Sequence, residues 1–144
     1  MRFDQTQQMT AGYLIPPAAR DADNTPASFD IGTADACSIF IEVGVGGITF
    51  TTTNKVEFKL THSDAASAGF EPVTLEDVVG VEAVGAGGIV RALIAAHATP
   101  SVAAIGYVGG KRYLRMLADF SGTHNTPTPM AVLGVRSRLL SVAP

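Results

Sequence analysis

The sequence predicts an all-β fold: an antiparallel β-sandwich, jelly-roll-like, with about seven or eight strands, one short helix and an extended N-terminal arm. Two observations lead to this prediction. Apolar residues alternate with polar ones over short runs, as in strands that bury one face. Clusters of Gly, Pro, Ser, Asn and Asp, which favour turns, separate these runs. The 144 residues suit one domain that needs no disulfide to fold.

Residues 1–28 differ in composition from the rest and are expected to form the arm, with the β-sandwich domain over residues 29–144. The arm is rich in Gln, Thr, Ala, Asp and Pro, and Pro16-Pro17 opposes regular structure. Two interpretations stay open: a disordered terminus, or an arm that becomes ordered against a neighbouring subunit. Its one expected anchor point is the apolar group Tyr13, Leu14 and Ile15.

The first strands follow the arm. A short strand is expected at 29–31, and 36–43 predicts a central strand because apolar residues occupy both of its faces. The Thr-rich stretch 48–53 is expected to be a loop or an edge strand. The clearest strand is 55–62, whose alternation predicts one buried and one solvated face. Its expected core side chains are Val56, Phe58, Leu60 and His62.

The middle of the chain combines short elements with glycine-rich turns. A brief strand is expected at 70–73. A Thr cap, acidic residues in the first turn and a glycine stop predict a short helix or a single turn at 74–80. Residues 83–88 are expected to form a loop. The spacing at 89–97 fits a helix or a strand, and a strand is favoured because a glycine and a proline bound it closely.

The stretch 102–120 is expected to be a β-hairpin. Its two apolar-rich runs meet at Gly109-Gly110, and a two-residue glycine turn matches the twist of paired strands. A loop at 121–129 and a last strand at 130–140 complete the sandwich. One face of the second run is expected to lie on the core: Arg112, Leu114, Met116, Ala118 and Phe120.

Composition argues against several classes of partner. The formal net charge is −3 and no basic patch is apparent, so nucleic acid is not an expected partner. The apolar runs are interrupted well before the ~20 residues that a membrane span needs, and the polar N-terminal residues do not predict a signal peptide. No membrane partner is therefore expected. The single cysteine, Cys37, is expected to be a buried, inert thiol of a chain made in a reducing cytoplasm.

No constellation of residues predicts catalysis, so the expectation is a protein that is not an enzyme and holds no cofactor. The histidines, His62, His97 and His124, lack the spacing of metal ligands. The glycine-rich stretches 44–47 and 85–88 lack the Lys-Ser/Thr of a phosphate loop and are expected to be turns. No Gly-x-Ser-x-Gly nucleophile motif is present.

Arginines are concentrated late in the chain, and two interpretations of them stay open. They form a solvated face, or they form an interface where guanidinium groups bind carboxylates of a neighbour. Tyr and Arg are enriched at interface centres, which adds Tyr113 to the second interpretation. The arginines are Arg112, Arg115, Arg136 and Arg138.

Three stretches are similar to strings that recur in head proteins of tailed phages and prophages: 56–64 with 70–73, 106–115, and 118–123. On these residues the chain, over 27–140, resembles the tailed-bacteriophage head decoration, or cement, proteins, a family of small jelly-roll-like virion proteins encoded near the major capsid protein. The turn at Ser63-Asp64-Ala65-Ala66 departs from the family's usual Ser-Asp-Asp/Asn-Gly, which argues against an ion-binding form of that turn.

The resemblance implies a virion protein on the capsid exterior that binds the major capsid protein and copies of itself, as a homotrimer, and clamps capsid subunits without catalysis. An extended arm suits this role because extended peptide adds to exposed sheet edges. Another virion role, as a head–tail connector, tail or head-spike protein, stays open, as does a ligand-binding jelly-roll module. The expected interface residues are Tyr13, Leu14, Ile15, Arg112, Tyr113, Arg115, Arg136 and Arg138.

Overall fold

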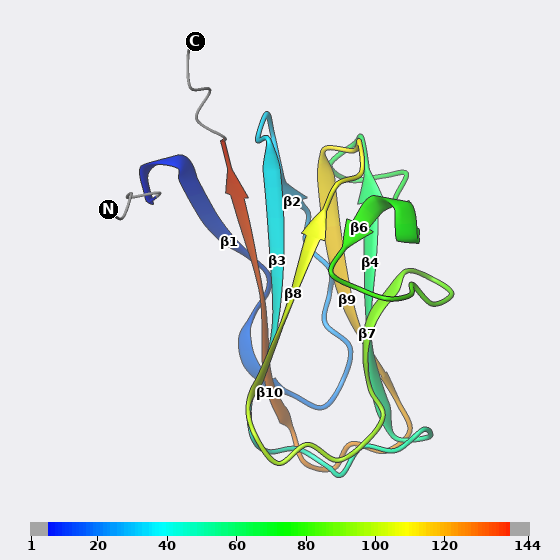
Figure 1. The fold of residues 1–144 in the computed structure, drawn as a ribbon. Coiled ribbons are helices and arrows are strands. Elements are labelled where there is room, and N and C mark those ends of the chain that lie inside the picture. Colours follow the sequence, from blue (N-terminus) through cyan, green and yellow to red (C-terminus); the bar gives the residue numbers. More distant parts are fainter. Residues whose placement is uncertain (1–5, 139–144) are drawn as a thin grey trace.

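The computed structural model describes residues 6–138 as two antiparallel β-sheets packed face to face (Figure 1). Sheet A has the strand order β1-β10-β3-β8-β6, and sheet B has the order β2-β9-β4-β5, with β7 also paired to β4. The predicted all-β sandwich is confirmed. The elements are η1 (Thr6–Gln8), β1 (Met9–Arg20), β2 (Phe29–Asp30), β3 (Ala36–Val43), β4 (Lys55–Ser63), β5 (Glu71–Pro72), η2 (Leu75–Asp77), β6 (Val78–Val79), β7 (Ile89–Leu93), β8 (Ser101–Tyr107), β9 (Tyr113–Ser121) and β10 (Thr128–Ser137).

Eight of these strands have the order of a jelly roll, with β1-β10-β3-β8 in one sheet opposite β2-β9-β4-β7 in the other. Most strands that are consecutive along the chain therefore lie in opposite sheets, as β1 and β2 do, or β8 and β9. The other two strands, β5 and β6, have two residues each and lie in the connection between β4 and β7. The predicted seven or eight strands correspond to the main ones.

The core lies between the sheets and is built by alternation. In β3, β4 and most of β9, every second side chain is buried and the intervening ones are partly exposed. The faces predicted for 55–62 and for the second run of 102–120 are those observed, with two exceptions: Arg112 is exposed, because it precedes β9 and bonds to Asp30, and Phe120 is only partly buried. In 36–43, which is apolar on both faces, the buried set is Cys37, Ile39, Ile41 and Val43. The apolar side chains of the two inner faces pack against each other and are removed from water, and this hydrophobic burial is the main contribution to the stability of such a sandwich.

The prediction of a hairpin at 102–120 is wrong. Strand β8 pairs with β3 and β6 in sheet A, whereas β9 pairs with β4 and β2 in sheet B. The connection crosses the end of the sandwich, where the amides of Val108 and Gly109 donate to the Asp77 carbonyl at 2.8 and 3.2 Å. Neither Gly109 nor Gly110 has a positive φ, so no primed turn forms. A connection between the two sheets is favoured over a hairpin because it places the apolar faces of β8 and β9 on opposite sides of one core.

The prediction of a separate N-terminal arm is wrong for residues 9–20, which form β1 at the edge of sheet A and pair with β10. Pro16 and Pro17 lie where the register of this pairing shifts, and a proline is tolerated on an edge strand because its missing N–H faces no neighbouring strand. Leu14 and Ile15 are buried in the core at 1 % and 0 % exposure, so the anchor is real and lies within the same chain. Residues 1–5 lie outside the described residues.

Several shorter predictions are settled by the same structure. Residues 48–53 form a loop whose Phe50 is buried, and 89–97 forms a strand only over β7. The predicted turn at 74–80 is the single turn η2, where the Asp77 carboxylate accepts from the Thr74 amide at 2.8 Å. The last strand ends at Ser137, and residues 139–140 of the predicted strand lie outside the described part of the chain.

The Asn24 side chain forms the hydrogen bonds that a neighbouring strand would otherwise form at one edge of sheet B. Strand β2 covers only the first residues of β9, and the rest of that edge is left to the connection between β1 and β2. The Asn24 side chain, 8 % exposed, donates to the Met116 carbonyl at 3.1 Å and accepts from the Ala118 amide at 2.8 Å. One amide side chain thus satisfies both groups of a buried strand edge.

We predict that Asn24→Ala lowers the free energy of unfolding by roughly 2 kcal/mol, because it leaves a buried carbonyl and a buried amide of β9 without partners. Urea denaturation measures this change. Asn125→Ala, the same substitution at an exposed loop position, is the control and is expected to change the value by less than about 0.5 kcal/mol. Equal stability of the two variants would contradict the role given to Asn24.

Cys37 is confirmed as a buried thiol on the inner face of β3, and burial raises its pKa to about 11. The thiolate is the reactive form, so we predict that the thiol reagent DTNB labels the native protein at pH 8 far more slowly than it labels the protein in urea. Rapid labelling of the folded protein would show that β3 opens locally or that the thiol is accessible.

Candidate interaction surface

The outer face of sheet A carries almost no charge. Residues directly opposite each other in a sheet point to the same side, so the strand register defines this face. One row across it is Tyr13, Leu133, Phe40 and Ala104, contributed by β1, β10, β3 and β8 in turn. The whole outer face comprises Met9, Ala11, Tyr13, Ala36, Ser38, Phe40, Glu42, Val79, Val102, Ala104, Gly106, Ala131, Leu133, Val135 and Ser137. Glu42 is its one charged residue.

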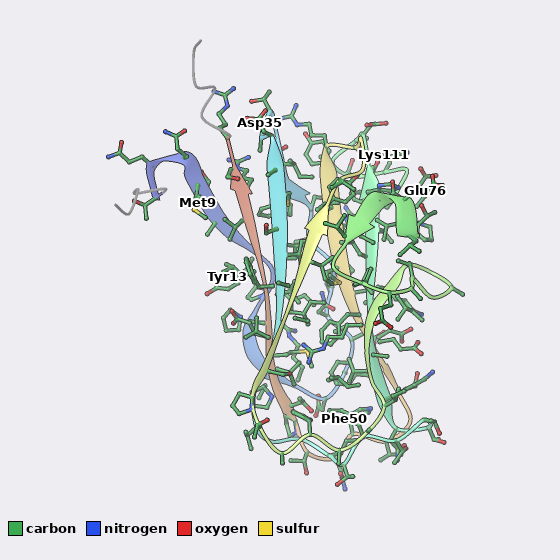
Figure 2. The ribbon with its side chains drawn as sticks, viewed as in Figure 1. Met9, Tyr13, Asp35, Phe50, Glu76 and Lys111 are labelled. Atoms are coloured by element: carbon green, nitrogen blue, oxygen red, sulfur yellow. The ribbon has the colours of Figure 1, made fainter. Side chains whose placement is uncertain are left out.

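Large apolar side chains on this face are open to solvent. Val102 is 64 % exposed, Val79 53 %, Tyr13 52 % and Met9 42 %, and Figure 2 shows Tyr13 and Met9 on the outside of β1. A groove of about 570 Å³ continues the face at its lower end, between Pro17, Val102 and Pro129. Contiguous exposed apolar surface of this kind is typical of a binding surface for another protein.

The outer face of sheet B has the opposite character. Lys59 forms an ion pair with Asp119 at 2.5 Å, and Lys55 forms one with Glu57 at the same distance. The hydrogen bond from Lys59 to Asp119 is the main reason that the pKa of Lys59 is raised. The Lys59–Asp119 pair joins β4 to its neighbour β9, the Lys55–Glu57 pair lies along β4 itself, and all four side chains are partly exposed to water. The two outer faces therefore differ: sheet B presents paired charges, and sheet A presents a mainly apolar surface with a single charged residue, Glu42.

The structure separates the predicted interface residues. Leu14 and Ile15 lie in the core and cannot contact a partner in this fold, whereas Tyr13 lies on the outer face of sheet A. Arg115 stacks on the Phe70 ring at 4.0 Å and donates to Ser28 Oγ at 3.0 Å, so it fastens two surface segments of its own chain. Its role is structural.

The other three predicted arginines gather around one turn between β2 and β3. Arg112 holds the Asp30 carboxylate with two bonds, of 2.8 and 2.9 Å, and lies 5.2 Å from the centre of the Tyr113 ring. Arg136 donates to the Asp30 carbonyl at 2.8 Å, and Arg138 donates to a threonine hydroxyl in the same turn. The hydrogen bond from Arg112 is the largest cause that holds the pKa of Asp30 below its usual 3.8.

Sequence reasoning missed the centre of the outer face of sheet A: Phe40, Leu133, Val102 and Val79. The signal was present, because 36–43 has apolar residues on both faces. That pattern predicts a central strand, which β3 is, since it lies between β10 and β8, but it does not by itself predict an exposed apolar surface. Which of two apolar faces meets the opposite sheet depends on the pairing of distant strands, and no local pattern reports it.

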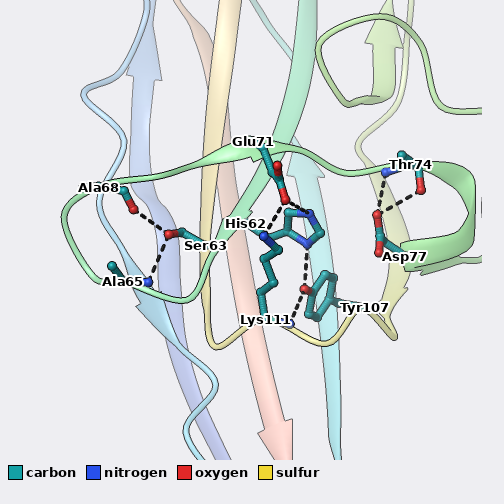
Figure 3. Close-up of polar contacts among 9 residues, drawn as sticks. All are labelled: His62, Ser63, Ala65, Ala68, Glu71, Thr74, Asp77, Tyr107 and Lys111. Atoms are coloured by element: carbon teal, nitrogen blue, oxygen red, sulfur yellow. Dashed lines mark hydrogen bonds and ion pairs between the residues drawn. The ribbon is translucent and has the colours of Figure 1, made fainter.

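His62 belongs to a group of polar contacts with Tyr107, Lys111 and Glu71 (Figure 3). Its Nδ1 lies 2.8 Å from the hydroxyl of Tyr107, which also accepts from the Lys111 amide at 3.1 Å. His62 lies on β4 and Tyr107 on β8, so the bond joins the two sheets. Lys111 in turn pairs with the Glu71 carboxylate. His62 is 5 % exposed, which confirms its predicted place on the core face.

Within residues 6–138, no group of three or more His, Cys, Asp or Glu side chains lies close enough together to hold a metal ion. The same residues contain no helix that is long and apolar enough to cross a membrane. Comparison with protein-family models, curated proteins and solved structures finds no match to this chain. A functional conclusion therefore has to come from the surfaces of the molecule and from the resemblance noted in its sequence.

The Asp30–Arg112 pair makes a specific prediction for acid stability. A carboxyl whose folded pKa lies below its unfolded value stabilises the fold above the unfolded value and loses that effect as the pH falls through the folded pKa. Stability should therefore fall as the pH drops below about 3.8, and Asp30→Asn should remove part of this dependence. Urea denaturation between pH 6 and pH 2 measures it. Asp21→Asn, at an exposed aspartate, is the control; identical pH profiles for the two variants would contradict the prediction.

Proposed function

We propose that this protein is a structural virion protein that decorates and stabilises the capsid shell of a tailed phage, a cement protein that binds capsid subunits without catalysis. The observation that carries the proposal is the outer face of sheet A, which has one charged residue and several exposed apolar side chains, opposite a face whose charges are paired. The motifs similar to phage head proteins supply the class of partner, the major capsid protein. Localisation to the capsid exterior and assembly as a homotrimer are part of the same proposal.

The size of the face suits a protein partner. The four long strands of sheet A, spaced about 4.8 Å apart and paired over about 26 Å of their length, cover on the order of 500 Å². Stable interfaces bury about 800 Å² per partner, so this face supplies most of one. Many copies bound to one lattice also gain from multivalency, so each single contact can be weak.

The mechanism is binding through burial of apolar surface. Covering Val102, Tyr13 and Phe40 with the apolar surface of a partner removes them from water, which favours association by about 25 cal/mol per Å² of apolar area. Because β1 is an edge strand, its free side also offers main-chain groups to an extended segment of the partner. The N-terminal residues thus contribute to binding through β1 rather than as a detached arm.

A second virion role is the alternative: a head–tail connector, tail or head-spike protein would use the same apolar face. Copy number separates the two, because a cement protein covers the shell lattice whereas a connector or spike occupies single positions. Quantitative mass spectrometry of purified particles, with the major capsid protein as the internal standard, measures the ratio. A ratio near one copy per capsid subunit supports the cement role, and a ratio near that of portal or tail proteins overturns it.

We predict that Tyr13→Asp combined with Val102→Asp weakens co-sedimentation with capsids of the encoding phage by at least about tenfold. The two carboxylates would have to be buried without partners, and each tenfold loss corresponds to about 1.4 kcal/mol. Both wild-type side chains are more than half exposed, so the fold should tolerate the change.

The matched control is Ile94→Asp, which places a carboxylate at an apolar side chain that is 47 % exposed and lies outside the outer face of sheet A. It should leave co-sedimentation unchanged. If the control weakens binding as much as the double variant does, the outer face of sheet A is not the capsid-binding surface.

A further inference from the structure

A cleft at the end of the sandwich has a strong excess of positive charge. It has a volume of about 420 Å³ and lies where β1 begins, β10 ends and the turn from β2 to β3 passes. Among the described residues that line it, three are arginines, Arg112, Arg136 and Arg138, and one is a carboxylate, Asp30. Asp35, the next acidic residue along the turn, does not line the cleft, and the arginines would outnumber the carboxylates even if it did.

Arg136 lies on the inner side of β10, and Arg138 follows in the same alternation just after the strand ends. Positions 132, 134 and 136 of β10 share one face, which begins in the core at Val132 and passes Gly134 before it leaves the core. Arg136 and Arg138 thus cover the open end of the interior, where the strand has no opposite sheet to pack against. Long side chains there reach across to the turn at Asp30 and frame the cleft.

Most guanidinium N–H donors of Arg136 and Arg138 have no acceptor among the side chains and backbone of residues 6–138. A guanidinium carries five N–H donors. Arg112 uses two of its groups on the Asp30 carboxylate, which also accepts from the Gly32 amide at 2.7 Å. Within the described residues, Arg136 reaches only the Asp30 carbonyl, and Arg138 reaches only the Thr33 hydroxyl, at 3.3 Å.

We propose that this cleft binds a carboxylate from an acidic segment of a protein partner. A planar guanidinium matches a carboxylate with two parallel hydrogen bonds, and Arg136 and Arg138 keep the donors for them. A single negative charge suits the cleft better than a phosphate does, because Asp30 already places one carboxylate there and would repel a doubly charged group more strongly. The segment that binds belongs to the capsid partner if the proposed function holds, but the preference for a carboxylate does not depend on it.

The test uses the full-length, ¹⁵N-labelled protein and a blocked triglutamate peptide as the probe. The backbone amide signals of Gly32 and Thr33 and the side-chain Nε–H signals of Arg136 and Arg138 should shift saturably with the peptide. A blocked triglutamine peptide, which has the same length without the charge, should leave them in place. Inorganic phosphate tests for a general anion site and should bind more weakly than the triglutamate peptide.

Two variants test which side chains bind. Arg138→Gln, at an exposed strand end, should weaken triglutamate binding by about fivefold, and the double variant with Arg136→Gln by about tenfold or more. Lys55→Gln is the control. It removes one positive charge at the end of β4 that lies away from the cleft and should change binding by less than twofold. The NMR spectra also show whether each variant is folded. If the double variant is unfolded, the binding measured for Arg138→Gln tests the proposal.

Each outcome bears on the inference. No shift with triglutamate, equal shifts with triglutamine, equal or tighter binding of phosphate, or an equal loss in Lys55→Gln would overturn it. No capsid is needed, so a failure here leaves the co-sedimentation result untouched, and a failure of co-sedimentation leaves the carboxylate site standing.

Discussion

The mutual burial of two inner sheet faces is the constraint on which the rest of this structure depends. Alternating side chains of β3 meet those of β4 and β9, and neither sheet is stable with that face in water. The jelly-roll order satisfies the constraint by sending the chain back and forth between the sheets. The connections leave backbone groups at one strand edge and side chains at the end of the sandwich without strand partners. Asn24 provides the hydrogen bonds along the edge of β9, and the His62–Tyr107 bond joins the two sheets at the upper end.

The two outer faces are free of that constraint, and they differ. Sheet B carries Lys and Asp or Glu side chains that pair with one another, Lys55 with Glu57 along β4 and Lys59 with Asp119 across to β9, so these charges are satisfied in water. Sheet A presents Phe40, Leu133 and Val102 with a single carboxylate, which is an unfavourable surface for a protein that stays unpartnered. The contrast directs the functional conclusion toward binding. The cleft that Arg136 and Arg138 frame adds a separate polar contact, at the end of the sandwich.

Local patterns predicted the elements better than their partners. Alternation identified the strand at 55–62 and its buried set, and the cap and stop signals identified the turn at 74–80. The prediction of a hairpin at 102–120 was wrong because a glycine-rich link can connect two strands of different sheets as well as two neighbouring strands of one sheet. The prediction of a separate arm was wrong because Pro16-Pro17 opposes regular structure in general, whereas an edge strand with a shifted register accommodates both prolines. Arg115 looked equivalent to Arg112 in sequence, but the fold commits it to Phe70.

The sequence pattern alone predicted the class of fold, and it predicted the buried face of a strand only where the two faces differ in polarity, as at 55–62, because side chains alternate with a period of two whatever a strand pairs with. It also placed Cys37 and His62 inside. Only the tertiary structure decided which strands are neighbours, since pairs such as β1 with β10 join residues more than a hundred positions apart. That pairing assembles Tyr13, Phe40 and Leu133 into one surface and brings Asp30 to Arg136. Both candidate binding sites are therefore products of long-range pairing.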